Sequence, residues 1–85
     1  MHYLYLLKSK KENFTYIGST DNLQRRLLEH NHGKNQATKF YAPFKIVYYE
    51  AYANKSDALS REYKLKHYGS ASGHLKKRVA KSIED

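Results

Sequence analysis

Two short runs of aromatic and aliphatic residues near the start of the chain predict a pair of β-strands. Residues 3–7 read Tyr-Leu-Tyr-Leu-Leu and residues 14–18 read Phe-Thr-Tyr-Ile-Gly, and the polar stretch 8–13 separates them. This arrangement is typical of a β-hairpin. Because the side chains of a strand alternate between its two faces, Phe14 and Tyr16 should share one face of the second strand, and the two tyrosines of the first run should share one face of theirs.

The rest of the chain alternates between helical and strand-like patterns. These patterns predict a helix with Asp21 as its N-cap and Gly33 at its end, followed by an irregular segment at 34–43 and a strand at 44–52. A second helix is expected from Asn54 to about Tyr68, where Gly69 ends it. An exposed helix is expected at 74–85. The third strand is apolar enough to be expected at the centre of the sheet. The fold class is therefore α+β, with one domain over residues 1–85. Helices flank a small, largely antiparallel three-stranded sheet in the order β-β-α-β-α-α.

Composition narrows the range of functions. The chain has 85 residues, no cysteine, and 16 lysines and arginines against eight acids, which gives a net charge of +8. The lack of cysteine excludes a disulfide scaffold, cysteine-ligated zinc and a thiol nucleophile. No apolar run is long enough to cross a membrane. We expect a cytoplasmic protein, and the charge favours a polyanionic partner, nucleic acid before anionic lipid.

The first predicted helix carries polar residues beside its apolar side. At 100° per residue, Leu23, Leu27 and His30 fall in one narrow sector. Arg26 lies at the edge of that sector, whereas Arg25 faces solvent. Arg26 is either an arginine that lies along the surface and covers apolar area, or a group directed at a ligand. His30 taken alone is more typical of a hydrogen-bonded packing histidine than of a functional one.

A carboxylate interrupts the apolar face of the second predicted helix. Ala58, Leu59 and Leu65 define that face, and Glu62 projects between them. Because an unpaired buried charge is strongly unfavourable, Glu62 needs a partner. The partner is either Lys66, four residues further on, or a cation or substrate in a cleft. We favour the cleft.

These positions form part of a longer pattern. The chain contains Tyr3-Leu4-Tyr5 and, eleven residues after Tyr5, Tyr16-Ile17-Gly18, followed directly by Ser-Thr-Asp-Asn-Leu-Gln-Arg-Arg-Leu-Leu-Glu-His. This pattern resembles that of GIY-YIG nuclease domains, a family that includes homing endonucleases, the incision domain of bacterial excision repair and structure-specific resolvases. The resemblance continues through 45–50 and 58–66 and covers about residues 3–68. It is closest to the small, single-domain bacterial members.

The resemblance implies catalytic roles for five residues. Tyr5 and Tyr16 stand at the tyrosines of the two tripeptide motifs, Arg26 at the catalytic arginine, His30 at a histidine common on the same helix, and Glu62 at the metal-binding glutamate. Tyr3 replaces the glycine of the first tripeptide. No counterpart is found for the polar residue, often asparagine, that some relatives have near the end of the domain.

The activity that the resemblance implies is that of a divalent-metal-dependent endonuclease acting on phosphodiester bonds in DNA, with DNA repair or recombination as its setting. A single Mg²⁺ or Mn²⁺ bound by Glu62 is expected, because the chain offers few converging acids and Mg²⁺ is often held by one or two carboxylates plus phosphate oxygens. Arg26 would hold the phosphate. Tyr16 would orient or deprotonate the attacking water with His30 as the proton acceptor, and Tyr5 would hydrogen-bond the water or the phosphate.

Further contacts with nucleic acid are expected from basic residues outside this set: Lys8, Lys10, Lys11, Lys34, Lys39, Lys76, Lys77 and Arg78. Contacts of this kind are independent of base sequence and sensitive to salt. We therefore expect weak sequence specificity, DNA before RNA, no membrane partner, and a monomer or weak homodimer that acts alone or with a protein partner. One alternative is a nucleic-acid-binding module on the same fold that cleaves little or nothing, and another is a partner-docking protein.

Overall fold

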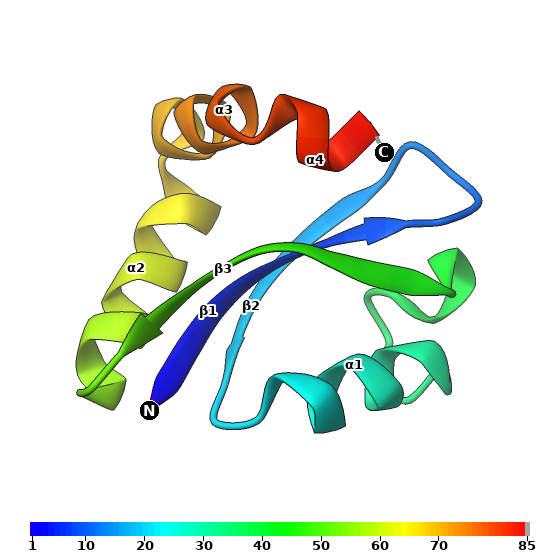
Figure 1. Ribbon diagram of the computed structural model, residues 1–85, viewed down its shortest axis with the longest axis horizontal. Coiled ribbons are helices and arrows are strands. Elements are labelled where there is room, and N and C mark those ends of the chain that lie inside the picture. Colours follow the sequence, from blue (N-terminus) through cyan, green and yellow to red (C-terminus); the bar gives the residue numbers. More distant parts are fainter. Residues whose placement is uncertain (85) are drawn as a thin grey trace.

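The computed structural model describes residues 1–84, which form a three-stranded sheet with helices on both of its faces (Figure 1). In chain order the elements are β1 (His2–Ser9), β2 (Thr15–Thr20), α1 (Leu23–Asn31), a 3₁₀ turn (Lys39–Tyr41), β3 (Phe44–Tyr52), α2 (Lys55–His67), α3 (Gly69–Arg78) and α4 (Ala80–Glu84). All strand pairs are antiparallel. The expected α+β class is confirmed. Among the described residues, no helix is both long and apolar enough to span a lipid bilayer.

The first strand, and not the third, occupies the centre of the sheet. β1 pairs with β2 on one side and with β3 on the other, so the expectation of a central third strand is wrong. The reason lies in burial on both faces. Leu4 and Leu6 on one face and Leu7 on the other are at most 1% exposed, whereas β3 leaves Tyr49 about half exposed. A strand that is apolar on both faces is best placed where both faces are covered.

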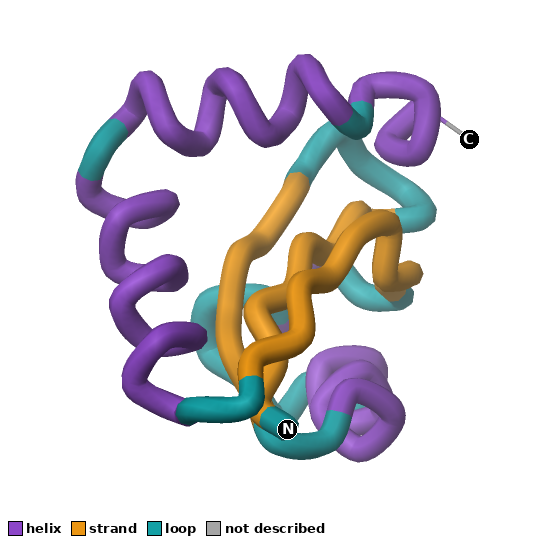
Figure 2. Tube along the Cα trace, turned by 60° about the vertical axis from the view of Figure 1, so that its left-hand side comes forward, coloured by secondary structure: helices purple, strands orange, loops and turns teal. Residues whose placement is uncertain are grey.

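Helix α1 covers one face of the sheet, and α2, α3 and α4 cover the other (Figures 1 and 2). Two apolar clusters result: Tyr5, Leu7 and Phe44 with Leu23 and Leu27 of α1, and Leu4, Leu6 and Ile17 with Leu65 of α2 and Leu75 of α3. Because β2 is an edge strand, side chains from both layers can approach each other around it. This edge is where the candidate site lies.

The helix ends follow local hydrogen bonds, with one difference from expectation. Asn22, and not Asp21, caps α1: its side-chain oxygen accepts from the backbone N–H of Arg25 at 3.0 Å. The chain is extended at Asn22, which aims that oxygen at the free N–H groups of the first turn. Asp21 instead forms an ion pair with the Arg25 guanidinium. Gly33 follows the helix with φ of 73°, as expected of a helix stop, and the expected cap at Asn54 is confirmed.

The C-terminal helical region starts earlier and packs more closely than expected. Instead of one exposed helix at 74–85, α3 already begins at Gly69, and a break at Val79 separates it from α4. Leu75 is only 1% exposed, and Val79 and Ile83 pack against the same apolar cluster. Their spacing of four residues forms a narrow apolar stripe, which covers the sheet. Residue 85 lies outside the described residues.

Candidate active site

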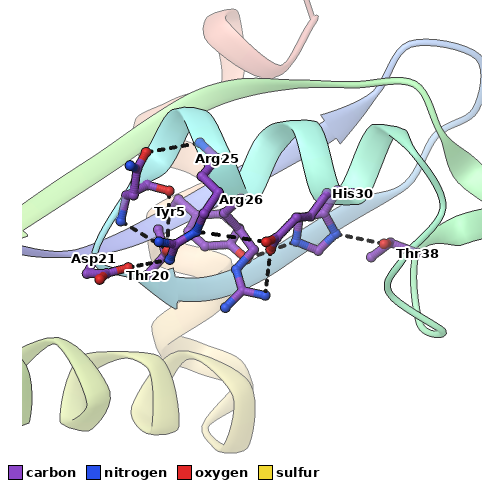
Figure 3. Close-up of polar contacts among 9 residues, drawn as sticks. Tyr5, Thr20, Asp21, Arg25, Arg26, His30 and Thr38 are labelled. Atoms are coloured by element: carbon purple, nitrogen blue, oxygen red, sulfur yellow. Dashed lines mark hydrogen bonds and ion pairs between the residues drawn. The ribbon is translucent and has the colours of Figure 1, made fainter.

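A buried chain of hydrogen bonds joins β1 to α1. The Tyr5 hydroxyl lies 2.9 Å from His30 Nε2, and His30 Nδ1 lies 2.7 Å from the hydroxyl of Thr38. His30 and Thr38 are fully buried, and Tyr5 is 3% exposed. Figure 3 shows His30 and Arg26 extending from α1, with Tyr5 beneath the helix and Thr38 beyond His30. The expected packing histidine is therefore present, with hydrogen bonds on both ring nitrogens.

These hydrogen bonds change the roles expected for Tyr5 and His30. Burial lowers the pKa of His30, and the nearby Arg26 guanidinium lowers it further, so the ring is neutral near pH 7. Burial raises the pKa of Tyr5, and although Arg26 opposes this shift, the phenol keeps its proton. Both ring nitrogens are occupied by hydroxyl groups in either tautomer. His30 is thus not placed to accept a proton from Tyr16, and the Tyr5 hydroxyl is directed at His30 rather than at solvent.

The glycine of the second tripeptide makes room for Tyr5. Tyr5 and Gly18 face each other across β1 and β2. A Cβ atom on Gly18 would stand 2.4 Å from the Tyr5 hydroxyl oxygen and 2.6 Å from Cζ, far inside van der Waals contact. The aromatic ring therefore lies directly over the glycine backbone, which allows its hydroxyl to reach His30 in the layer above.

Arg26 borders a pocket at the end of β2. Its Nη1 lies 3.3 Å from Glu29, and its side chain is 38% exposed. Its Nε is buried and has no hydrogen-bond partner within residues 1–84, an arrangement that is uncommon in folded proteins. The pocket has a volume of about 420 Å³ and is lined by His2, Ser19, Thr20, Asp21, Arg26, Lys55 and Leu59. A guanidinium at the rim of such a pocket can bind an anion through two N–H groups at once.

Glu62 reaches the edge strand from α2. One carboxylate oxygen accepts from the Ser19 hydroxyl at 2.7 Å, and the other lies 3.0 Å from the ammonium of Lys66. The same ammonium stands 4.9 Å from the centre of the Tyr16 ring. Of the two partners expected for Glu62, the structure thus shows Lys66, the one we favoured less. Leu59, expected on the apolar face of this helix, is 43% exposed and lines the Arg26 pocket instead.

The structure brings four of the five candidate residues together and joins the fifth to them through its neighbours. Arg26 lies one helical turn before His30 on α1. Tyr5 and Tyr16 both contact the His30 ring, and their ring centres lie 5.9 and 5.3 Å from the centre of that ring. Glu62 is linked to this group by Lys66 and by Ser19. Tyr5, Tyr16, Arg26 and His30 belong to the α1 face of the sheet and Glu62 to the α2 face, so the two sets meet at the β2 edge.

The donor set fits a cation held largely by water and phosphate, and it does not fit a protein-enclosed metal. No group of three or more histidine or acidic side chains is placed to bind an ion among the described residues. Glu62 bonds to Ser19 on the edge strand, and its side chain is 21% exposed. Mg²⁺ commonly retains several waters and takes one or two protein carboxylates, so one glutamate is a sufficient protein ligand.

The expected nucleic-acid-binding lysines do not gather around the Arg26 pocket. Lys8 and Lys10 line a separate pocket with residues of α4, and Lys76 lines a third, at the hairpin end of the sheet (Figure 1). Lys39 stands over the ring of Phe40 on the segment after α1. The others are exposed on the surface: Lys11, Lys34, Lys77 and Arg78.

Sequence reasoning missed three residues that shape the site. Ser19 holds Glu62, Thr38 holds His30, and Lys55 at the start of α2 shares the pocket of Arg26. Ser19 had a usable signal, because it directly follows the second tripeptide on the edge strand. Thr38 had none, since it belongs to an irregular segment whose path no periodicity predicts.

Comparison with known proteins identifies the family to which the chain belongs. The GIY-YIG catalytic domain matches residues 1–77. The chain is 45% identical to a UPF0213 protein of Clostridium perfringens over 78% of its own length and 71% of that protein, and 42% identical to a UPF0213 protein of Staphylococcus haemolyticus over 76% and 79%. A UPF0213 protein of Lactiplantibacillus plantarum is 39% identical over 84% and 72%. No solved structure matches. The chain therefore belongs to the GIY-YIG family of nuclease domains.

Proposed function

We propose that the chain is a divalent-metal-dependent endonuclease that hydrolyses phosphodiester bonds in DNA with weak sequence specificity. The observation that carries this proposal is the grouping of Tyr16, Arg26 and Glu62 around the β2 edge of a GIY-YIG domain. Hydrolysis needs a positioned water, a group that binds the phosphate and a positive charge near the leaving oxygen. Tyr16 would supply the first part and Arg26 the second, and Glu62 would hold the metal ion that supplies the third.

Tyr16 orients the attacking water through its hydroxyl or, in its phenolate form, accepts the proton of that water. Its ring is half-buried between His30 and Lys66, and its hydroxyl forms no hydrogen bond within residues 1–84. The Tyr5 hydroxyl, by contrast, is hydrogen-bonded to His30. Tyr5 and His30 are therefore proposed as positioning residues, which fix α1 and its Arg26 above the strand that carries Tyr16.

Arg26 binds the phosphate that is cleaved. Its guanidinium lines the pocket and contacts Glu29 at 3.3 Å, and its buried Nε–H has no partner within residues 1–84 and can therefore donate to a phosphate oxygen. Glu62 would hold a Mg²⁺ or Mn²⁺ ion, which when bound supplies charge neutralisation at the phosphate and the leaving oxygen. The exposed lysines and Arg78 add affinity that does not depend on base sequence.

A nicking assay tests the proposal. Supercoiled plasmid and branched DNA are incubated with the protein in Mg²⁺, in Mn²⁺ and in excess chelator. Metal-dependent nicking is expected, with Tyr16→Phe and Glu62→Ala each reducing it by at least about 100-fold, the lower range for loss of one catalytic group. Tyr68→Phe and Glu12→Ala make the same changes at exposed positions away from the site and should nick normally. A fully active Tyr16→Phe protein would refute the assigned role.

One observation favours a second function, that of a nucleic-acid-binding module with little or no cleavage. Glu62 is already paired with Lys66, and no cluster of three metal-binding side chains exists in the described part of the chain. In that case the protein should shift DNA in a salt-sensitive way without nicking it under any metal condition, and Glu62→Ala should leave the shift unchanged.

A further inference from the structure

One ammonium group joins the two sides of the candidate site. Lys66 lies one helical turn after Glu62, and its Nζ stands 3.0 Å from Glu62 Oε2 and 4.9 Å from the centre of the Tyr16 ring. Glu62 approaches the edge strand from the α2 layer, whereas Tyr16 belongs to the cluster under α1. The Lys66 ammonium therefore places a positive charge between Glu62 and Tyr16 at the β2 edge.

The carboxylate of Glu62 has both oxygens engaged in this state. Oε1 accepts from Ser19 and Oε2 from Lys66. A divalent cation needs lone pairs of this carboxylate, and at Oε2 it meets an ammonium at the distance of a direct ion pair. The two positive groups also repel each other across a few ångströms, in a position where Glu62 is only 21% exposed and screening by water is reduced.

We propose that Lys66 is an internal counter-ion for Glu62 that competes with the divalent cation for the carboxylate. The inference rests on the proposed function, because it takes Glu62 as the metal-binding residue. Lys66 neutralises Glu62 before metal arrives and lowers the affinity of the site for metal. The exchange needs no movement of the backbone, because the ammonium sits on a flexible four-carbon stem with 36% of the side chain exposed.

Ser19 has the complementary part in this exchange. Its hydroxyl holds Oε1 at 2.7 Å, on the strand next to Gly18. When the ammonium leaves Oε2, the carboxylate is still held by this second hydrogen bond and keeps its direction toward the β2 edge. Glu62 thus stays in place while its counter-ion changes.

Mn²⁺ titration of the protein without nucleic acid tests the competition. The paramagnetic ion broadens the amide signals of residues near its site, so the signals of Ser19 and Glu62 report binding in a ¹H–¹⁵N spectrum that also shows whether each variant is folded. Lys66→Met keeps an unbranched side chain that is one atom shorter and removes the charge. Lys64→Met removes the same charge from an exposed position on the same helix and serves as the matched control.

We expect Lys66→Met to reach half-maximal broadening at a Mn²⁺ concentration about 1.5- to 5-fold lower than the unmodified chain, the range that the measured strength of such ion pairs implies. Lys64→Met should shift the midpoint much less. Equal midpoint shifts in the two variants, or a higher midpoint in Lys66→Met, would overturn the inference and leave the metal site intact. If Ser19 and Glu62 are not broadened in any of the three proteins, Glu62 is not the metal ligand, and the inference is overturned together with the metal role in the proposed function.

Discussion

Replacing Gly18 with alanine adds a single methyl group at a crowded contact between β1 and β2. The new Cβ would stand 2.4 Å from the Tyr5 hydroxyl oxygen, 2.6 Å from Cζ and 3.2 Å from Cε1. Such a contact is easily relieved when the neighbour is the free end of a flexible side chain. Here the neighbour is a ring that is 3% exposed and whose hydroxyl is bonded to buried His30. The ring must therefore move, and the Tyr5–His30 hydrogen bond must lengthen or break.

The expected loss of stability combines these two effects. Overpacking by one methyl group in a well-packed core costs about 1–3 kcal/mol, and the loss of one buried hydrogen bond adds about 1 kcal/mol. The φ angle of Gly18 is not positive, so alanine can adopt its backbone conformation. Alanine also lowers the conformational entropy of the unfolded chain, which stabilises the folded protein by about 0.4–1 kcal/mol. The steric terms dominate, and the net loss should be about 2–3 kcal/mol. For a domain of this size, each kcal/mol lowers Tm by about 4–8 °C.

Thermal unfolding followed by circular dichroism measures the effect. Gly18→Ala should melt roughly 10–20 °C below the unmodified chain. Gly73→Ala is the matched control: no atom lies within 4 Å of its added Cβ, and the residue is inside α3, so this variant should be equal or more stable by up to about 1 kcal/mol. If Gly18→Ala melts within about 2 °C of the unmodified chain, Tyr5 is not held over Gly18 as described.

Two further predictions concern polar groups that are hydrogen-bonded to other side chains, buried Thr38 and half-buried Glu50. Thr38→Val keeps the shape of the side chain but leaves one ring nitrogen of His30 unpaired, so urea denaturation should show a loss of about 1–3 kcal/mol, and an unchanged midpoint would contradict the hydrogen bond. Burial of Glu50 acts to raise its pKa, but hydrogen bonds from Arg61 and from two tyrosines outweigh it and hold the pKa below its usual range. This stabilisation is present above the unfolded pKa of about 4.3 and is lost as pH falls through the lower folded pKa. The urea midpoint of Glu50→Gln should therefore change less with pH below about 4 than that of the unmodified chain. If both midpoints fall equally as the pH is lowered, the contribution of Glu50 to acid unfolding is refuted.

The parts of the fold that depend on residues close together in the sequence could be predicted. The third strand has the predicted bounds, 44–52, and Asn54 caps the helix that follows it. Strand order could not be predicted in this way, because it depends on which strand has both faces covered by distant helices. The choice between Asp21 and Asn22 as cap also escaped prediction. Both residue types favour that position, and the backbone angles of the turn decide between them.

The same holds for the candidate site, where local features could be predicted and long-range contacts could not. Helical periodicity placed His30 on the buried side of α1, and the structure confirms this. The partners of His30 could not be predicted, since Thr38 comes from an irregular segment and Tyr5 from a strand whose register is set by long-range pairing. The Glu62–Lys66 pair could be predicted as one of two options from its spacing of four residues. The second contact of the Lys66 ammonium, with the Tyr16 ring, depends on how α2 lies along the edge strand.

The two tyrosines of the paired strands have different surroundings, and this difference would let one small sheet combine a stable core with the proposed catalytic role of Tyr16. Tyr5 lies on the central strand, where its ring covers Gly18 and its hydroxyl fixes the buried helix residue His30. Tyr16 lies on the edge strand, where its ring is half-buried and the Lys66 ammonium stands 4.9 Å from the ring centre. A phenol can exchange protons or hold a water only where water can reach it, and a helix can be fixed only where water is excluded. Placing the motif tyrosines on a central and an edge strand meets both conditions within one hairpin.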